Sequence, residues 1–264
     1  MAVTQDFQAE LEGTLLMGNG TYYDIMIVQG LGGMPGVHTT DVLRLGDHGA
    51  YLIARDLVNS KVVNIGVQVI GTDATDLDTK IKAWRALWVP SDTVKTLKFK
   101  FKAFGYGDQI YMIRGSARRC AMDLGAEANF GVQTVYGSLE CQDPRVYADT
   151  LHSTAIAPSA TTNLTNAGVL TAPLTVSVNG PATTVTLTNN TTSEVWTGTF
   201  SVSSGQTLEI DMLARTVTKA GVSQRQSVNN ATTTWFGLRP GVNSITAVGG
   251  TSPGSTFTWR DTYL

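Results

Sequence analysis

The sequence predicts a mainly β protein built from two β-sandwich domains, the first of which carries a single packed α-helix. Three observations predict it. The 264 residues suit two compact units at about 150 residues per domain. Charged side chains thin out after residue 150, since residues 1–150 hold 14 Lys+Arg and 17 Asp+Glu and residues 151–264 hold 5 and 4. Short β-type runs recur along the chain, and only one segment has a clear helical period.

The composition change places the domains at residues 1–150 and 151–264, with net charges of −3 and +1. Residues 151–163 form a polar, Pro-containing stretch without helical or strand periodicity, and we expect the linker there. Hydrophobic residues make up 42% of the chain, which is enough for packed cores and excludes disorder as the main state.

Residues 73–89 are predicted to form the helix of the first domain. Apolar side chains recur there at spacings of four, three and four residues, which places them on one helical face: Leu77, Ile81, Trp84 and Trp88. Asp73 or Asp76 can cap its start, and Pro90 cannot continue it.

The rest of the first domain is predicted to be antiparallel strands. Residues 97–104 alternate strictly, with an apolar face and a basic, solvated face: Leu97, Phe99, Phe101 and Ala103 against Lys98, Lys100 and Lys102. Further β-branched and aromatic runs cover residues 22–28, 61–70, 109–113 and 130–140. Residues 30–49 contain six glycines and little periodicity, so we expect a contact element, an arm that reaches a neighbouring subunit.

Short strands about ten residues apart fill the second domain, as in a sandwich or jelly roll. The candidates are residues 169–178, 183–187, 194–202, 207–212, 216–219, 241–248 and 255–260. No helix of normal length is predicted there.

The chain offers little for catalysis, cofactors or metals, and we predict no catalytic, cofactor-binding or metal site. Cys120 and Cys141 are too few for a disulfide framework and are expected to be buried thiols. The histidines lack metal-ligand spacing and are expected to be solvated loop residues: His38, His48 and His152. No apolar run reaches the ~18 residues of a membrane span, and the start of the sequence lacks a signal-peptide pattern.

Three binding or catalytic alternatives remain open. The basic cluster of Arg114, Arg118 and Arg119 could meet nucleic acid, but a net charge of −2 favours a solvated or subunit-pairing face. Glu209 and Asp211 share a strand face and could form the pair of carboxyl groups that a glycoside hydrolase needs. Three tryptophans of the second domain could instead stack on sugar rings in a carbohydrate-binding module: Trp196, Trp235 and Trp259.

The C-terminal segment runs from Trp235 through the turn Leu-Arg-Pro-Gly-Val-Asn, which contains Pro240, Gly241 and Asn243, to a final aromatic strand. This succession resembles the closing signature of the distal tail proteins of long, non-contractile-tailed bacteriophages. Residues 166–173 and 204–217 resemble earlier strands of that family. In the first domain, the Asp-Pro-x-x-Tyr of Asp143, Pro144 and Tyr147 is similar to the motif that closes the family's N-terminal domain. Pro240 and Gly241 are typical of the central positions of a β-turn, and the side-chain amide of Asn243 can link this turn to the next strand.

The resemblance implies a structural virion protein at the tail tip, made in the host cytoplasm. Its first domain would assemble into a hexameric ring around the central channel, and its second would be a galectin-like sandwich facing outward. The ring would join the tail tube protein to the tail-tip or tail-associated protein, with no specific nucleic-acid binding and no membrane insertion. Some relatives carry inserted carbohydrate-binding modules, for which this sequence leaves no room. The rival prediction is a host-adhesion module that grips glycans with the C-terminal sandwich.

Overall fold

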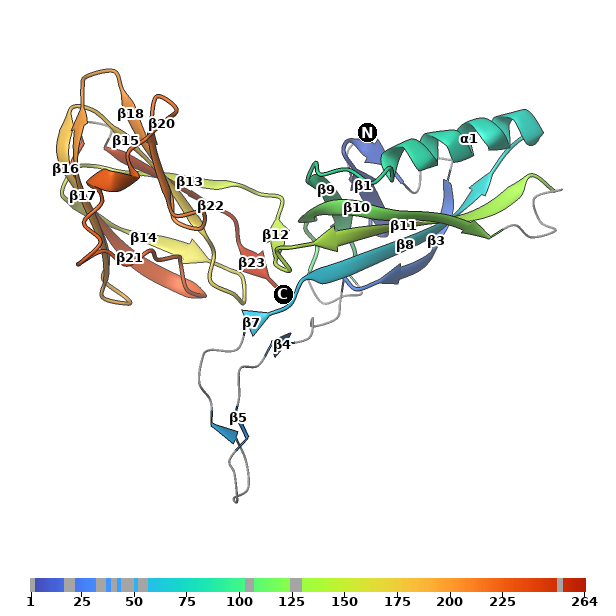
Figure 1. The fold of residues 1–264 in the computed structure, drawn as a ribbon, viewed down its shortest axis with the longest axis horizontal. Helices are drawn as coiled ribbons and strands as arrows, with labels where there is room; N and C mark the ends of the chain where they lie inside the picture. The colour runs from blue at the N-terminus through green and yellow to red at the C-terminus, as the bar shows by residue number, and fades with distance from the viewer. Residues whose placement is uncertain are drawn as a thin grey trace. The chain divides into compact units, whose positions relative to one another are not determined.

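The computed structural model describes residues 3–16, 22–31, 37–38, 42–43, 50–51, 57–102, 107–123, 130–250 and 254–264. The chain divides into two compact units, Met1–Asp149 together with Leu264, and Thr150–Tyr263. Antiparallel strands dominate both, and one α-helix lies in the first (Figure 1). The predicted mainly β fold class with a single packed helix is confirmed.

The N-terminal unit is built on a continuous antiparallel strand order, β2-β1-β9-β10-β11-β8-β3, with β12 paired to β10. Its strands are β1 (Gln8–Leu11), β2 (Thr14–Leu15), β3 (Tyr22–Gln29), β8 (Lys61–Ile70), β9 (Lys95–Lys100), β10 (Tyr111–Asp123), β11 (Val132–Cys141) and β12 (Val146–Ala148). The prediction for residues 61–70 matches β8 exactly, whereas the run at 109–113 marks only the start of β10. Ala103 lies outside the described residues.

Strand β10 changes partners halfway along its length. Residues 111–115 pair with β9 and residues 116–123 pair with β11, with a register shift between Ala117 and Arg119. At the changeover a Cβ on Gly115 would lie 2.5 Å from the carbonyl oxygen of Glu140, so only glycine allows this approach. A strand shared in this way lets two sheet segments fold over a common core.

Helix α1 (Ala74–Leu87) lies along one face of the sheet that contains β8 and β11 (Figure 1). Asp73 caps it by accepting a hydrogen bond from the backbone N–H of Asp76 at 2.8 Å. Leu77, Trp84 and Trp88 are buried. The predicted helix, its cap and its apolar face are therefore confirmed.

Two short antiparallel pairs follow β3. β4 (Val37–His38) pairs with β7 (Leu57–Val58), and β5 (Val42–Leu43) pairs with β6 (Ala50–Tyr51), the nested order of a β-hairpin. Most of the Gly-rich arm predicted at residues 30–49 lies outside the described residues. Its root is well fixed: a Cβ on Gly30, whose φ is +86°, would sit 1.9 Å from the Val62 carbonyl oxygen, and the ammonium group of buried Lys61 donates to the Leu31 carbonyl at 3.0 Å.

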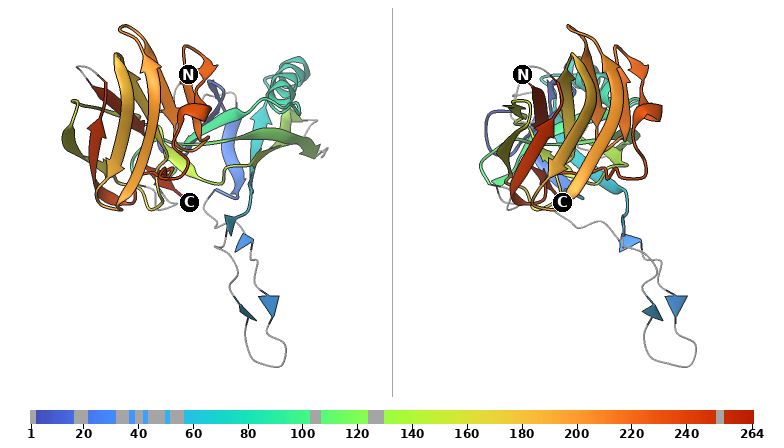
Figure 2. Two further views of the ribbon diagram at one scale, coloured as in Figure 1. Left: turned by 60° about the vertical axis from the view of Figure 1, so that its left-hand side comes forward. Right: turned by 90° about the vertical axis from the view of Figure 1, so that its left-hand side faces the viewer.

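The C-terminal unit is a sandwich of two antiparallel sheets, ordered β13-β22-β15-β18-β19-β20 and β14-β21-β16-β17 (Figure 2). The strands of the two sheets are β13 (His152–Ile156), β14 (Ala160–Asn166), β15 (Leu174–Asn179), β16 (Ala182–Asn189), β17 (Glu194–Val202), β18 (Thr207–Asp211), β19 (Thr216–Lys219), β20 (Val222–Ser223), β21 (Gly241–Val248) and β22 (Ser255–Trp259). The short strand β23 (Thr262–Tyr263) follows them and lies in neither sheet. A short 3₁₀ turn, η3 (Arg225–Ser227), follows β20. Inward side chains of both sheets form one apolar core that includes Val176, Leu187, Trp196, Ile210 and Phe257.

The linker predicted at residues 151–163 is wrong, because this stretch forms β13 and the start of β14. β13 pairs with β22 along its length, and β14 pairs with β21. Each strand places few large apolar side chains in the core, chiefly Ile156 and Leu164, and the outward positions carry Thr, Ser and Asn. These strands are held by backbone hydrogen bonds more than by apolar side chains. The alternation of apolar and polar residues in this stretch is therefore too weak to predict a strand.

Candidate functional site

The turn that closes the C-terminal sandwich is organised by Asn243. Gly241 has a φ of +91°, a conformation that the missing side chain permits. The carboxamide oxygen of Asn243 accepts from the Arg239 N–H at 3.0 Å, and its NH₂ group donates to the carbonyls of Arg239 at 2.8 Å and Gly241 at 3.1 Å. Asn243 is fully buried, so the predicted tie between the Pro240–Gly241 turn and strand β21 is confirmed in atomic detail.

Two other buried asparagines, Asn166 and Asn189, secure neighbouring turns. Asn166 donates to the carbonyls of Leu170 at 2.8 Å and Leu238 at 3.0 Å, and accepts from the Gly168 N–H. Asn189 contacts the Asn243 carboxamide at 3.4 Å. An Asn two residues before a glycine is the pattern that could have indicated the first.

Asp143, Arg145 and Tyr147 form a compact knot at the end of the N-terminal unit. The Arg145 guanidinium donates to both carboxylate oxygens of Asp143, at 2.7 and 3.0 Å, and the Tyr147 hydroxyl donates to Oδ2 at 2.5 Å. Pro144 separates the carboxylate from its partners in sequence and limits the backbone conformations of this segment. The motif therefore has a fold-making role, and Arg145 is the member that the sequence analysis missed.

Burial next to this knot predicts a loss of stability at alkaline pH. Burial raises the pKa of the Cys141 thiol from 9.0 to about 12, and burial, followed by the Asp143 charge, raises the pKa of Tyr147. When the pKa of a group is higher in the folded state than in the unfolded state, the protonated group stabilises the fold. This contribution to the free energy of unfolding is fully present below the unfolded-state pKa, and it is lost as the pH rises from the unfolded-state pKa to the folded-state pKa. For Cys141 we expect the free energy of unfolding to fall between pH 9 and about 12, by at most about 1.4 kcal/mol per pH unit. Chemical denaturation across this range should show a shallower decline for Cys141→Ala, and an unchanged decline would contradict the prediction.

The three tryptophans do not form an open sugar-binding platform. Trp196 and Trp259 are buried, and the Trp259 indole N–H donates to the Thr165 carbonyl at 3.1 Å. Trp235 is partly buried, stands edge-on to Trp196 and is covered on its ring by the Arg225 guanidinium, 4.9 Å from the ring centroid. Trp196 and Trp259 therefore belong to the core of the sandwich, and Trp235 lies at the edge of that core.

Acidic partners neutralise the lysine face of β9. Lys98 pairs with Asp149 at 3.0 Å, and Lys100 and Lys102 both pair with Asp108, at 2.9 and 3.1 Å. Hydrogen bonds from Lys100, then Lys102, lower the pKa of the Asp108 carboxyl. In the second basic group, Arg118 pairs with Glu140 at 2.7 Å. The predicted solvated basic face of Lys98, Lys100 and Lys102 is thus a set of ion pairs, in which Lys100 and Lys102 share one carboxylate.

The candidate catalytic carboxylates serve local structure. Glu209 accepts from the Ser177 hydroxyl at 2.6 Å, and Asp211 accepts from the backbone N–H groups of Leu213 and Ala214. His152 lies 3.1 Å from Asp261, whose other oxygen accepts from the Ala167 N–H. The side chains of His38 and His48 lie outside the described residues.

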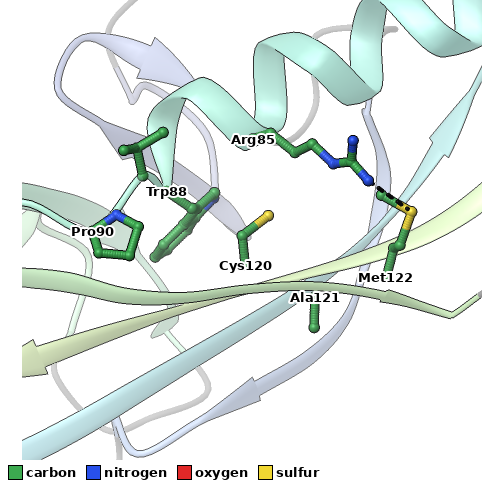
Figure 3. Close-up of a pocket in the computed structure, with 7 residues that line it drawn as sticks. Arg85, Trp88, Pro90, Cys120, Ala121 and Met122 are labelled. Carbon is green, nitrogen blue, oxygen red and sulfur yellow. Dashed lines mark hydrogen bonds between the residues drawn. The ribbon is translucent and has the colours of Figure 1, made fainter.

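A small apolar cavity of about 250 Å³ lies between the end of α1 and strand β10, lined in part by Trp88, Pro90, Cys120 and Met122 (Figure 3). Arg85 reaches over it and donates to the Met122 sulfur at 3.5 Å. Burial raises the pKa of the Cys120 thiol, so the thiol stays protonated at neutral pH and is a poor nucleophile.

Metal-ligating side chains do not gather in the described parts of either unit: no group of three His, Cys, Asp or Glu residues there could hold an ion. None of the described helices is long and apolar enough to cross a membrane.

Comparisons with known proteins find two similarities, one to a family model and one to a solved structure. Residues 167–263 match the family model described as the siphovirus-type tail component, C-terminal domain. The fold matches the crystal structure of the Dit (gp 19.1) protein of phage SPP1, with a TM-score of 0.72 and 16% sequence identity, over 98% of this chain and 100% of that one. That protein is described as a paradigm of hub adsorption apparatus in phages that infect Gram-positive bacteria. No curated protein sequence matches significantly.

Proposed function

We propose that the chain is the ring-forming hub at the distal end of a phage tail, because residues 167–263 match the family model of siphovirus-type tail components. In this role the N-terminal unit closes a ring of six copies, and the ring joins the tail tube protein to the tail-tip protein. The observation that carries the proposal is the shared fold with SPP1 Dit along nearly the whole length of both chains. We propose further that the chain acts as an assembly protein and not as an enzyme.

The edge of the N-terminal sheet supports assembly between copies. Strand β3 is eight residues long and stands at the end of the strand order. In the part of the chain that the structure describes, its outer edge pairs with no other strand. A long edge with free backbone groups is a template for pairing with another chain. In a ring such contacts are heterologous, so a different surface of the neighbouring copy must accept the edge.

The functional motifs support the same role. The Asn243 turn closes the C-terminal sandwich, and the hydrogen bonds among Asp143, Arg145 and Tyr147 tie together five consecutive residues at the end of the N-terminal unit. Each is an internal network of hydrogen bonds, which gives a rigid surface of defined shape. Rigid surfaces suit a subunit that must dock against several partners at once.

Light scattering across a concentration series, with the tail tube protein present, tests the ring. The proposal predicts a species that contains six times the 28.2 kDa of one chain. Substituting proline at a position of β3 whose backbone N–H points away from β8 removes a donor of the outer edge and should leave only smaller species. A wild-type chain that stays monomeric in the presence of the tube protein would contradict the proposal.

A further inference from the structure

The outer edge of β17 is covered by another segment of the same chain. β17 stands at one end of its sheet and pairs with β16 on its inner side. On its outer side lies the irregular segment of residues 228–235, which we call the strap. The strap approaches the strand closely enough for an antiparallel bridge between Val228 and Gly198. It therefore occupies the position that a further strand of the sheet would take.

The strap binds the backbone groups that β17 directs away from its sheet. The Thr197 carbonyl accepts from the Asn229 N–H at 3.1 Å, and the Val195 carbonyl accepts from the Thr234 N–H at 2.7 Å. The Thr233 hydroxyl accepts from the Thr197 N–H at 3.1 Å and donates to the Thr197 carbonyl at 2.9 Å. One side chain thus replaces the peptide groups that a partner strand would supply.

Buried side chains hold the strap at both ends. Val228 and Phe236 belong to the apolar core of the C-terminal unit. Trp235 stands edge-on to Trp196 of β17, with ring centroids 5.8 Å apart, and the Arg225 guanidinium covers it. Between these ends the side chains of the strap are mostly exposed. The middle of the strap is therefore held mainly by its hydrogen bonds to β17.

The sequence of β17 explains why its edge needs a cover. Residues 195–202 read Val-Trp-Thr-Gly-Thr-Phe-Ser-Val and contain neither a charged residue nor a proline. Segments of six or seven residues with high β propensity, low charge and no proline pair readily with copies of themselves. Proteins block such edges with a charge, a proline or a covering loop. Since this stretch has no charge and no proline, the strap is its protection.

We propose that the strap keeps β17 from pairing with β17 of a second copy of the chain. Two identical strands can pair in antiparallel orientation about a two-fold axis, because each presents the same backbone groups to the other. Loosening the strap exposes such an edge. The inference goes beyond the proposed ring function and does not depend on it, because the contacts of the strap lie within the C-terminal unit of one chain.

Hydrogen exchange of the full-length protein under native conditions tests whether the strap closes this edge. Thr233→Val keeps a similar shape but removes the acceptor of the Thr197 N–H, which should exchange faster by about tenfold or more. Thr232→Val is the matched control, because Thr232 is exposed on the same strap and its hydroxyl forms no hydrogen bond in the part of the chain that the structure describes. This control should leave the exchange rate of Thr197 unchanged.

Light scattering of the same variants, without the tail tube protein, tests the pairing itself. Thr233→Val should form dimers or larger species as its concentration rises, whereas Thr232→Val should have the same mass as the wild type. Adding Thr199→Lys to Thr233→Val places a charge on the exposed side of β17 and should abolish this association. A ring built through the N-terminal units would not respond to Thr199→Lys, so the two kinds of assembly are distinguishable.

Three results overturn the proposal in variants with wild-type circular dichroism. They are an unchanged exchange rate of Thr197 in Thr233→Val, faster exchange without association, and association that persists when Thr199→Lys is added. If Thr233→Val does not fold, Arg225→Ala, which uncovers Trp235 at the end of the strap, replaces it in both measurements with the same expected results.

Discussion

Asn243→Ala is expected to destabilise the C-terminal domain by about 3–5 kcal/mol, the range for losing a buried polar network together with its volume. The substitution leaves the Arg239 N–H and the carbonyls of Arg239 and Gly241 without the partner that Asn243 provides. It also removes the partner of the Asn189 carboxamide. The expected readout is a large drop in the melting temperature of that domain in the full-length protein.

Asn163→Ala is the matched control for this prediction. Asn163 lies on β14, opposite Ser244 of β21, and its side chain is exposed. Substitutions at such surface positions change stability by no more than about 0.5 kcal/mol. If both variants melt within a degree of the wild type, the Asn243 network does not hold the closing turn.

Gly137→Ala is expected to cost about 3–5 kcal/mol, similar to the loss of a buried aromatic side chain. A Cβ at this position would lie 2.1 Å from two ring atoms of Trp88, so the fully buried indole must leave its place between α1 and the sheet. Near-ultraviolet circular dichroism and tryptophan fluorescence should report the displaced ring.

A double-mutant cycle separates this steric conflict from a general weakening of strand β11. Once Trp88→Ala has removed the indole, the Gly137 methyl has space, so the double variant should be about as stable as Trp88→Ala alone. Additive costs would show that glycine is needed at position 137 for a reason other than Trp88.

Sequence periodicity predicted the elements whose side chains divide cleanly between core and solvent. Residues 194–202 and 241–248 coincide with β17 and β21, and the helix and its Asp73 cap were also correct. In each case apolar residues recur with the period of the element, so the pattern carries the structure directly.

The elements that were missed depend on contacts that no local pattern encodes. β13 and β14 are polar strands held by backbone pairing to β22 and β21, whose paired residues lie between 75 (Asn166 to Gly241) and 107 (His152 to Trp259) positions later in the chain. β1 buries Gln8 and Glu10 beside apolar residues, so it does not alternate.

At the candidate site, the turn chemistry of Pro240, Gly241 and Asn243 was readable from local sequence, because each residue type acts within the turn itself. The burial of Trp196 and Trp259 was not, since a tryptophan on a strand gives no sign of which face it occupies until the register is known.

Cryo-electron microscopy of the intact tail tests the central claim most directly, because it locates the chain among its neighbours. The account predicts a closed ring of six copies at the distal end of the tail, between the tube and the tip, with the N-terminal units in contact around the axis. Copies distributed along the tube, or a distal end built without this fold, would contradict it.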